Sequence, residues 1–431
     1  MTSSDCTLDR AALADLAAQR LDWRFKAIPD ALWGLTLAEA AARAPRLDDF
    51  VGPVVVIEAE PLEHNLRTMA EWCARAGVRL APHGKTTMAP QLFARQAEHG
   101  AWAITAANAS QLRVYRAFGV SRVLLANQLV DPAALRWLAA ELNAHPDFEF
   151  SCWVDSVESV ELMTEALRGT PRPVDVLVEL GGDGGRTGVR DLATGLAVAE
   201  AAQASPALRL AGTGGYEGAL AHDPGAHSRR VVADYLRGLR ELTLEIGRHG
   251  LFAGLAEVIV TAGGSAYFDQ VADALTGDWG GLPVLPVLRS GAYLTHDDGF
   301  YRGISPLGEA PRIPGTPPLR SALRAWAQVT SRPTDDLALL TLGKRDASFD
   351  EGLPEPQWHR RPGAPPEPLA GHSVTALNDQ HAFVALPAGS PLRVGDWVGL
   401  GLSHPCTVFD KWPLLPVVHG ATVVDFVRTY F

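Results

Sequence analysis

The segment RLAPHGKTTM, residues 79–88, ends an apolar run with two side chains that can move protons. His83 and Lys85 follow Pro82 with one glycine between them. A lysine in a loop is ordinarily a solvated surface charge, whereas a lysine in a cleft can act as a nucleophile or a general base. The residue types alone do not choose between these two interpretations. The choice depends on where the surrounding elements place the segment.

Three further segments combine glycine with a polar side chain. ELGGDGGRTGV delivers Arg186, GTGGYEG delivers Tyr216, and TAGGS occupies residues 261–265. The first of them is not a dinucleotide-binding fingerprint, because no acidic residue closes a strand at the required distance. In TAGGS the small residues leave backbone N–H groups bare ahead of the helix-like AYFDQVADAL. That arrangement is typical of a phosphate site, and equally of a plain helix cap.

A fifth segment, SHPCTVFDKW, contains His404 and Cys406 with one residue between them. In an extended strand, positions i and i+2 point the same way, so the imidazole and the thiolate could bind one soft cation such as zinc. The structural alternative is a core cysteine beside a capping histidine. Two ligands are too few for a closed structural site, but a catalytic metal keeps open positions that can receive a substrate's oxygens.

Eight short apolar runs, separated by helix-like segments, would position these groups. They span residues 78–83, 102–105, 122–127, 148–155, 174–180, 208–213, 257–263 and 284–291. Continuous rather than alternating hydrophobicity predicts strands buried on both faces, as in a parallel sheet. The α/β pattern therefore predicts a (β/α)8 TIM-like barrel, with a doubly wound open sheet as the alternative. Because a barrel builds its active site from the loops after its strands, all but the fifth segment would meet at one rim.

The residue composition and the hydrophobic periodicity of the sequence change on both sides of this barrel. Residues 1–50 contain LDRAALADLAAQRL and LTLAEAAARA, which have helical periodicity and predict an N-terminal helical extension. Residues 51–304 would form the barrel, preceded by an additional strand, VVVIEAE, at 54–60. Residues 305–431 begin with a Pro/Gly-rich connection and continue as short apolar runs broken by turns. They predict a C-terminal antiparallel β domain, in which WHRRPGAPPEPLAG would be an exposed loop.

The bulk composition excludes several classes of protein. The chain has 431 residues, of which 47% are hydrophobic and 20% charged, as is typical of a soluble globular protein. A net charge of −11 provides no basic surface for nucleic acid. The N-terminus lacks the apolar core of a signal peptide, and no stretch is apolar enough to span a bilayer. The four cysteines do not have the regular spacing of a disulfide framework, which indicates reduced thiols. We therefore expect a cytoplasmic protein.

Taken in order, PHGKT, GGRTGV, GYEG, GGS, RSGAYLTHD and HPC resemble the fold-type III pyridoxal 5′-phosphate (PLP) enzymes. These have an alanine racemase N-terminal-like barrel and a C-terminal β domain. Within them the chain looks like the branch of D-serine dehydratase, D-threonine aldolase and the D-3-hydroxyaspartate enzymes, often called amino-acid deaminases. The resemblance covers residues from about 50 onward, and it implies that the strand at 54–60 packs with the β domain.

The resemblance also implies a role for each candidate residue. Lys85 matches the lysine that carries the cofactor, with His83 beside it as a second catalytic candidate, and Arg186 matches an arginine that bonds the cofactor's phenolic oxygen. Either Tyr216 or Arg289 would face the pyridine nitrogen. The cofactor's phosphate would lie against Gly263, Gly264 and Ser265, with the backbone near Gly291 and Ala292. The metal pair would be His404 and Cys406.

The implied activity is that of a PLP- and divalent-metal-dependent lyase acting on β-hydroxy D-amino acids. Aldolase relatives carry an aspartate as the second metal ligand, whereas dehydratases carry a cysteine. Cys406 therefore favours a D-serine dehydratase-type deamination to a 2-keto acid and ammonia, and Zn²⁺ over Mn²⁺. D-threonine or D-3-hydroxyaspartate aldolase-type cleavage is the alternative, with His83 as the base. The family implies a homodimer, with no nucleic-acid or membrane partner.

Two other functions account for fewer of these features. A racemase of the same fold needs a second base, usually a tyrosine of the β domain. Tyr301, at the end of the barrel, and Tyr430, in the β domain, are the last two tyrosines of the sequence, and neither lies in a matching motif. A non-catalytic PLP carrier is typically a bare barrel, without a C-terminal domain or metal ligands.

Overall fold

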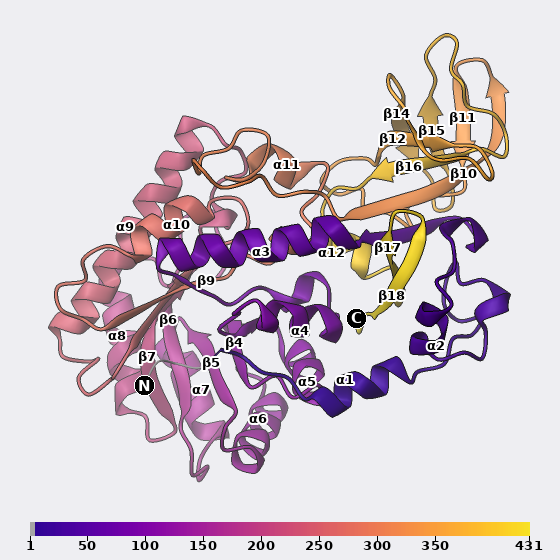
Figure 1. Ribbon diagram of the computed structural model, residues 1–431. Coiled ribbons are helices and arrows are strands. Elements are labelled where there is room, and N and C mark those ends of the chain that lie inside the picture. The colour runs from indigo at the N-terminus through magenta and orange to yellow at the C-terminus, as the bar shows by residue number, and fades with distance from the viewer. Residues whose placement is uncertain (1–4) are drawn as a thin grey trace.

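The computed structural model describes residues 5–431. Within these residues the strands form two sheets, one of eight strands and one of ten. Figure 1 shows the eight-stranded sheet and its helices on the left, the β domain at the upper right, and the two C-terminal strands between them. Both the predicted barrel and the predicted C-terminal β domain are present.

The strands of the parallel sheet are the predicted apolar runs. They are β2 (Arg79–Leu80), β3 (Ile104–Ala106), β4 (Arg122–Gln128), β5 (Glu149–Val154), β6 (Val174–Leu180), β7 (Leu208–Gly215), β8 (Val258–Ala262) and β9 (Val284–Leu288). They neighbour each other in chain order from β3 to β9, and β9 then pairs in parallel with β2. A bridge between His83 and Thr105 brings the remaining edges, β2 and β3, together. The sheet curls into a barrel, so the open doubly wound alternative is wrong.

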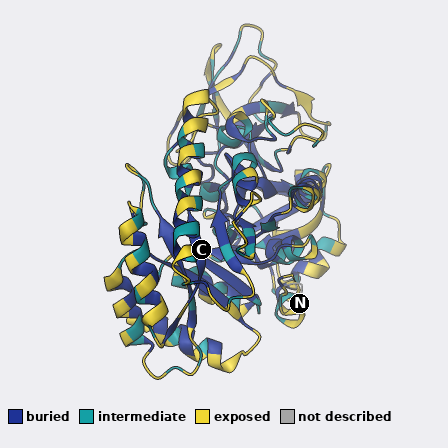
Figure 2. Cartoon of the chain, turned by 90° about the vertical axis from the view of Figure 1, so that its left-hand side faces the viewer, coloured by how far each residue is buried: buried dark blue, intermediate teal, exposed yellow. Residues whose placement is uncertain are grey.

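Helices between the strands cover the outside of the barrel. They are α4 (Pro90–Glu98), α5 (Ala109–Ala117), α6 (Pro132–Ala144), α7 (Val157–Ala166), α8 (Leu192–Ala204), α9 (Ala226–Arg248) and α10 (Phe268–Leu275). Two more helices flank the barrel strands in the sequence: α3 (Ala59–Ala76) precedes β2, and α11 (Phe300–Ile304) follows β9. Asp131, Ser156 and Asp191 cap α6, α7 and α8 by accepting hydrogen bonds from backbone N–H groups of the first turn. Figure 2 shows dark blue strands inside helices whose outer faces are yellow, as expected for a core buried by amphipathic helices.

The second sheet joins the start of the chain to its end. Its strands are β1 (Val54–Glu58), β10 (Leu323–Thr334), β11 (Leu337–Leu340), β12 (Glu355–Arg360), β13 (Glu367–Pro368), β14 (Ser373–Leu377), β15 (Ala382–Ala385), β16 (Trp397–Gly401), β17 (Leu414–His419) and β18 (Thr422–Arg428). β1 lies between β10, to which it is antiparallel, and β17, to which it is parallel. The first strand of the chain therefore belongs to the β sheet, and it ends at Glu58 because α3 begins at Ala59.

Two details of the predicted β domain are wrong. The segment WHRRPGAPPEPLAG is not simply an exposed loop, because its first residues complete β12 and the side chains of His359 and Arg360 are buried. The H-x-C segment is not a strand. It leads into a four-residue helix, α12 (Cys406–Phe409), because Pro405 occupies the helix N-cap with an α-helical φ of −53°.

The N-terminal segment packs against the β sheet. It forms α1 (Arg10–Ala17) and α2 (Leu37–Ala42) where helical periodicity was predicted, with turns and a short 3-10 helix, η1 (Asp30–Leu32), between them. Its buried side chains, including Leu21, Phe25 and Phe50, share a core with β17 and β18. Within residues 5–431 no helix is both long enough and apolar enough to cross a membrane.

Candidate active site

The loops after the barrel strands surround a cavity of about 670 Å³. Its lining contains nearly all of the predicted site residues, namely His83, Lys85, Arg186, Tyr216, Gly264, Ser265, Arg289, Gly291, Ala292, His404 and Cys406. Gly263 is buried beside Gly264 and does not reach the lining. Residues from the barrel and from the β domain, more than 300 positions apart in the sequence, therefore face one space.

His83 and Lys85 belong to the loop that follows β2. Gly84–Thr86 form a 3-10 turn, η3, with His83 as its N-cap residue. His83 Nδ1 is buried and has no hydrogen-bond partner among the described residues. Burial holds the pKa of His83 well below its usual value, and the charges of Lys85, Arg289 and Arg186 act in the same direction. The imidazole is therefore neutral near pH 7 and can accept a proton.

Two arginines of the cavity are held in different ways. The Arg186 guanidinium is exposed and lies over the Tyr216 ring, 4.6 Å from its centroid. Arg289 is completely buried, donates to Thr261 Oγ1 at 2.7 Å and to the Gly215 carbonyl, and lies over the Trp153 ring. Burial lowers the pKa of Arg289 to about 10, so it remains charged. Its Nε has no partner among the described residues.

Glu217 is an acidic residue of the site that the sequence motifs did not single out, although it stands inside GYEG. It is completely buried and accepts hydrogen bonds from the backbone N–H groups of Gly263 (3.0 Å) and Gly264 (3.1 Å). Burial raises the pKa of Glu217 despite these two donors. Two of the N–H groups predicted to face a phosphate are thus directed to a carboxylate instead. Ser265, whose hydroxyl oxygen accepts from Ala292 N at 3.1 Å, stays in the lining.

Glu179, at the end of β6, is a second buried acid of the site and, unlike Glu217, belongs to the cavity lining. Its carboxylate accepts from Gln128 Nε2 at 2.6 Å and from Thr187 Oγ1 at 3.1 Å. Burial raises the pKa of Glu179. The available signal was an acid at the carboxyl end of the strand VDVLVEL, because such positions face the site in a barrel.

His404 and Cys406 approach each other by a backbone kink. His404 has a φ of 46°, in the left-handed region that non-glycine residues rarely adopt. The buried Asp297 carboxylate fixes this kink by accepting a hydrogen bond from His404 N at 3.0 Å. The predicted i, i+2 geometry of a strand is wrong, but the two side chains still line the same cavity. Backbone strain held by tertiary contacts is a common feature of functional sites.

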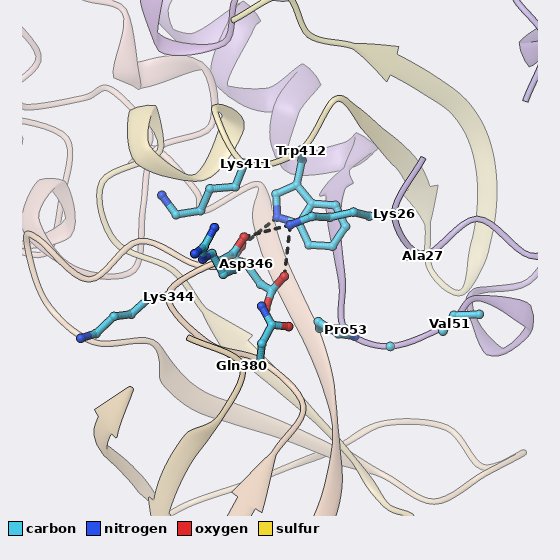
Figure 3. Close-up of a pocket in the computed structure, with 11 residues that line it drawn as sticks. Lys26, Ala27, Val51, Pro53, Lys344, Asp346, Gln380, Lys411 and Trp412 are labelled. Carbon is cyan, nitrogen blue, oxygen red and sulfur yellow. Dashed lines mark hydrogen bonds and ion pairs between the residues drawn. The ribbon is translucent and has the colours of Figure 1, made fainter. Parts of the chain in front are cut away.

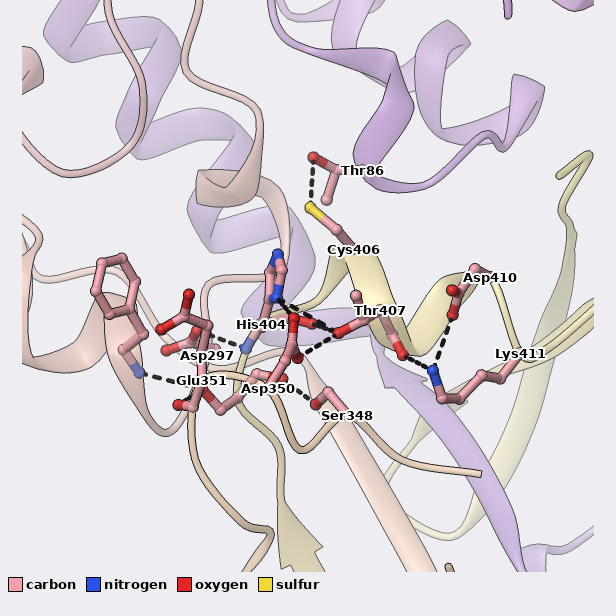
Figure 4. A network of polar contacts seen from close by, with 12 residues as sticks. Thr86, Asp297, Ser348, Asp350, Glu351, His404, Cys406, Thr407, Asp410 and Lys411 are labelled. Carbon is pink, nitrogen blue, oxygen red and sulfur yellow. Dashed lines mark hydrogen bonds and ion pairs between the residues drawn. The ribbon is translucent and has the colours of Figure 1, made fainter. Parts of the chain in front are cut away.

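Figure 4 shows the contacts around this pair. His404 Nδ1 lies 2.6 Å from Asp350 Oδ2, and the other oxygen of Asp350 accepts from Thr407 Oγ1 at 2.8 Å. The Cys406 thiol points toward Thr86 Oγ1, 3.5 Å away, in the 3-10 turn that carries Lys85. This contact joins the H-x-C segment to the lysine loop. No sequence spacing could have identified Asp350, which comes from a loop between β11 and β12.

The pair favours charged forms of both side chains. Interaction with Cys406 and with Asp350 raises the pKa of His404 to about 9, although burial opposes this. Burial raises the pKa of Cys406, but His404, Thr86 and the charge of Lys85 outweigh it and leave the pKa below its ordinary value. A thiolate is the form of cysteine that binds a metal ion. Within the described residues no group of three or more His, Cys, Asp or Glu side chains is arranged to hold a metal ion.

Two family profiles match the chain. The alanine racemase N-terminal domain matches residues 57–268, and the putative serine dehydratase domain matches residues 322–418. The first match covers most of the barrel, and the second covers most of the β domain with the H-x-C pair.

Individual relatives match over most of the chain. D-threonine aldolase from Arthrobacter sp. is 28% identical over 403 residues, which is 91% of this chain and 95% of the relative. The crystal structure of D-threonine aldolase from Filomicrobium marinum has a TM-score of 0.76 at 24% identity, covering 90% of this chain and 97% of that one. D-threo-3-hydroxyaspartate dehydratase from Delftia sp. HT23 has a TM-score of 0.70 at 19% identity, covering 89% and 99%.

Further solved structures of a D-threo-3-hydroxyaspartate dehydratase are a histidine-to-alanine mutant and a cysteine-to-alanine mutant, the second in a metal-free form. The two mutated positions of that enzyme are two residues apart, as His404 and Cys406 are here. The resemblance read from the motifs is therefore confirmed by both profiles and by these homologues. The chain contains an alanine racemase N-terminal domain and a D-serine-dehydratase-like domain, and it belongs to the fold-type III family of PLP enzymes.

Proposed function

We propose that the protein is a PLP- and divalent-metal-dependent lyase that acts on β-hydroxy D-amino acids and converts them to a 2-keto acid and ammonia. The observation that carries the proposal is the arrangement of Lys85 and the His404–Cys406 pair in one cavity, joined through the Cys406–Thr86 contact. A β-hydroxy amino acid has an α-proton and a β-oxygen on adjacent carbons. A lysine and a cation site facing one space are suited to act on both.

The cavity fits a flat, phosphorylated aldehyde cofactor. Lys85 would hold it covalently, Arg186 and Tyr216 would contact its ring, and its phosphate would lie at Ser265 and the backbone of Gly291 and Ala292. The wall leaves no room for larger residues. A Cβ atom on Gly264 would lie 2.9 Å from the Tyr216 ring, and one on Gly291 would lie 2.7 Å from the His83 carbonyl oxygen. Glycine lets the backbone approach the bound group closely.

The H-x-C pair fits a divalent cation of the zinc type. An imidazole and a thiolate are ligands that zinc prefers, and the contact of Asp350 with Nδ1 would leave the other ring nitrogen, Nε2, to bind the cation. With two protein ligands, other coordination positions remain for substrate oxygens. The metal-free form of the related cysteine-to-alanine mutant supports the same assignment.

When bound, the cofactor supplies an electron sink for charge that develops at the α-carbon, and the cation supplies Lewis acidity toward oxygen. The residues of the chain would move the protons. Lys85 Nζ would take the α-proton, and the neutral His83 beside it could receive or relay a proton. The buried walls, with Trp153 and Tyr301 in the lining, would exclude water around the reacting atoms.

Retro-aldol cleavage is the second candidate. The full-length similarity to D-threonine aldolase, 28% over 91% of the chain, favours it. For this reaction a base must take the proton of the β-hydroxyl group, and His83 would be that base because burial keeps it neutral. Cys406 at the second ligand position favours dehydration instead.

D-threonine separates the two reactions in a single assay. Dehydration gives 2-oxobutanoate and ammonia, whereas retro-aldol cleavage gives glycine and acetaldehyde. We expect keto acid and ammonia to form in equal amounts from the PLP-loaded enzyme with Zn²⁺, and Cys406→Ala or a chelator to lower the rate by two orders of magnitude or more. Keto acid and aldehyde are measured separately with dehydrogenase-coupled assays.

The controls distinguish the remaining functions. Cys152→Ala removes a buried cysteine of the barrel that lies outside the cavity lining, and it should leave metal dependence unchanged. Acetaldehyde and glycine as the main products would replace the proposal with an aldolase. Appearance of L-allo-threonine, the α-carbon epimer of the substrate, without cleavage would indicate a racemase, and no turnover of any D- or L-amino acid would indicate a PLP carrier. We also propose the homodimer that the family implies, which light scattering of the purified protein tests.

A further inference from the structure

A second hollow, of about 700 Å³, lies away from the cavity at the barrel rim. It is formed where the N-terminal segment meets the β domain, and Figure 3 shows its lining. The charged side chains of the lining are Lys26, Lys344, Arg345, Asp346 and Lys411. Four cations and one carboxylate thus face the same space, in a protein whose net charge is −11.

The use of lysine at this hollow is unusual for the chain. The sequence has 38 lysine and arginine residues, and only four of them are lysines. Lys85 lies in the catalytic cavity, and the other three all line this hollow. A lysine ammonium is a compact point charge that suits phosphate and carboxylate groups approaching from several directions. Lys26 and Lys344 are 318 positions apart in the sequence, and Lys344 and Lys411 are 67 apart. The fold brings all three to one hollow, which indicates a cation cluster because chance placement would scatter them.

Lys26 is held in place by buried neighbours, Asp346 and Trp412. Lys26 Nζ donates to the Arg345 carbonyl at 2.9 Å and lies 3.2 Å from Asp346 Oδ1, and it sits over the Trp412 ring at 4.8 Å from the centroid. Asp346 and Trp412 are both buried, and Trp412 Nε1 donates to the Asp346 carbonyl at 2.8 Å. The position of the Lys26 ammonium is therefore determined by the fold, whereas most surface lysines move freely.

The other cations are incompletely neutralised. Lys344 is exposed and makes no ion pair within the described residues, and Arg345 reaches Asp379 at 3.7 Å. Lys411 donates to the Thr407 carbonyl at 2.6 Å and lies 3.3 Å from Asp410. In Figure 3, Lys411 and Lys344 extend on one side of Asp346, with Pro53 and Val51 on the other. The open side of the hollow therefore presents several cations, of which Lys344 has no carboxylate partner among residues 5–431.

We propose that this hollow binds a small dianion, either a phosphate group or a pair of carboxylates on one molecule. Lys26 would anchor the anion against the Trp412 wall, and Lys344 and Lys411 would approach it from the open side. Through Thr407 the Lys411 side chain is also connected to Asp350, which holds His404. The anion would therefore bind next to the β-domain loops that carry the proposed metal pair. The inference does not depend on the reaction that the enzyme catalyses.

Calorimetric titration of the PLP-loaded protein tests the proposal, because the loaded cofactor occupies the phosphate position of the catalytic cavity. Inorganic phosphate and succinate are titrated in turn at constant ionic strength, so that the difference between them identifies the preferred anion. We expect one saturable site, and we expect the double variant Lys344→Gln/Lys411→Gln to bind at least about tenfold more weakly, as the loss of charge-assisted hydrogen bonds requires.

The matched control is Arg168→Gln/Arg237→Gln, which removes two exposed cations of the barrel, one in the turn after α7 and one in α9, each paired with a carboxylate three residues before it. It changes the net charge by the same amount and should bind like the unmodified protein. Lys344→Gln alone removes a side chain without an ion pair and should weaken binding by about threefold even if the double variant unfolds. Absence of a saturable site for both anions, or equal affinities in the double variant and its control, would overturn the proposal.

Discussion

Glu217, Asp297 and Asp350 are acidic side chains that hold other residues of the site in position. Glu217 accepts from two backbone N–H groups of the TAGGS loop, Asp297 fixes the left-handed His404, and Asp350 contacts the His404 ring. A carboxylate can hold several donors at once, so one acid can order a loop that has no regular secondary structure. At the scale of single residues, the geometry of the site depends on these acids as much as on the motif residues.

Asp350→Asn should weaken metal binding without removing a ligand. The carboxylate fixes the orientation of His404, and loss of such an outer contact typically costs about 10–100-fold in metal affinity. Asp410→Asn is the matched control, because Asp410 is an exposed neighbouring acid that pairs with Lys411 and does not contact His404. Zn²⁺ affinity is measured by competition with a coloured chelator. Equal affinities in the two variants would show that Asp350 does not orient the ligand.

At the scale of elements, the lysine loop after β2 is positioned by the loop after β9. β2 and β9 are neighbours in the barrel, and Gly291 contacts the backbone of His83. A Cβ atom at position 291 would lie 2.7 Å from His83 O and 3.0 Å from His83 N. Backbone atoms cannot rotate away as a side chain can, so these two loops require glycine at their contact.

Gly291→Ala should therefore push the His83–Lys85 loop away from its place. We expect a loss of about 1–3 kcal/mol in the free energy of unfolding, as for overpacking of a close contact, together with a clear loss of PLP binding. Gly303→Ala is the matched control in α11, where an added Cβ would meet no atom within 4 Å. The two variants are compared by urea denaturation and by the visible absorbance of bound cofactor. A normal cofactor spectrum in Gly291→Ala would contradict the argument.

The helices, strands and loops differ in how well the sequence predicts them. The eight barrel strands were predicted because burial on both faces leaves a continuous apolar run, and this signal is local. The backbone kink at His404 was not predicted, because the left-handed conformation of this histidine is stabilised by Asp297, which is more than 100 positions away in the sequence. The same limit applies to Asp350, which approaches His404 only after the β domain has folded. The motif residues of the cavity could be named from the sequence, whereas the contacts that orient them could not.

At the scale of the whole molecule, the two domains are connected by more than the linker at residue 305. β1 is the first strand of the chain, yet it lies in the centre of the β sheet. The residues before it reach the barrel as well, since Cys6 N donates to Ala101 O and Ser121 N donates to Thr7 O, both at 2.9 Å. The N-terminal segment therefore spans both domains. It also supplies Lys26 to the second hollow.

The N-terminal segment should accordingly contribute to stability as a core element. Leu21 is 1% exposed and packs in the same cluster as Val54 and Phe426, whereas Trp23, two residues on, is 75% exposed. Leu21→Ala should lower the apparent free energy of unfolding by about 2–5 kcal/mol, because it opens a cavity between this segment and the β sheet. Trp23→Ala removes a larger side chain from the surface and should change it by less than about 0.5 kcal/mol. Urea denaturation followed by circular dichroism measures both. If Leu21→Ala were as stable as Trp23→Ala, the segment would be a peripheral attachment to the fold, and its position could not fix Lys26 at the second hollow.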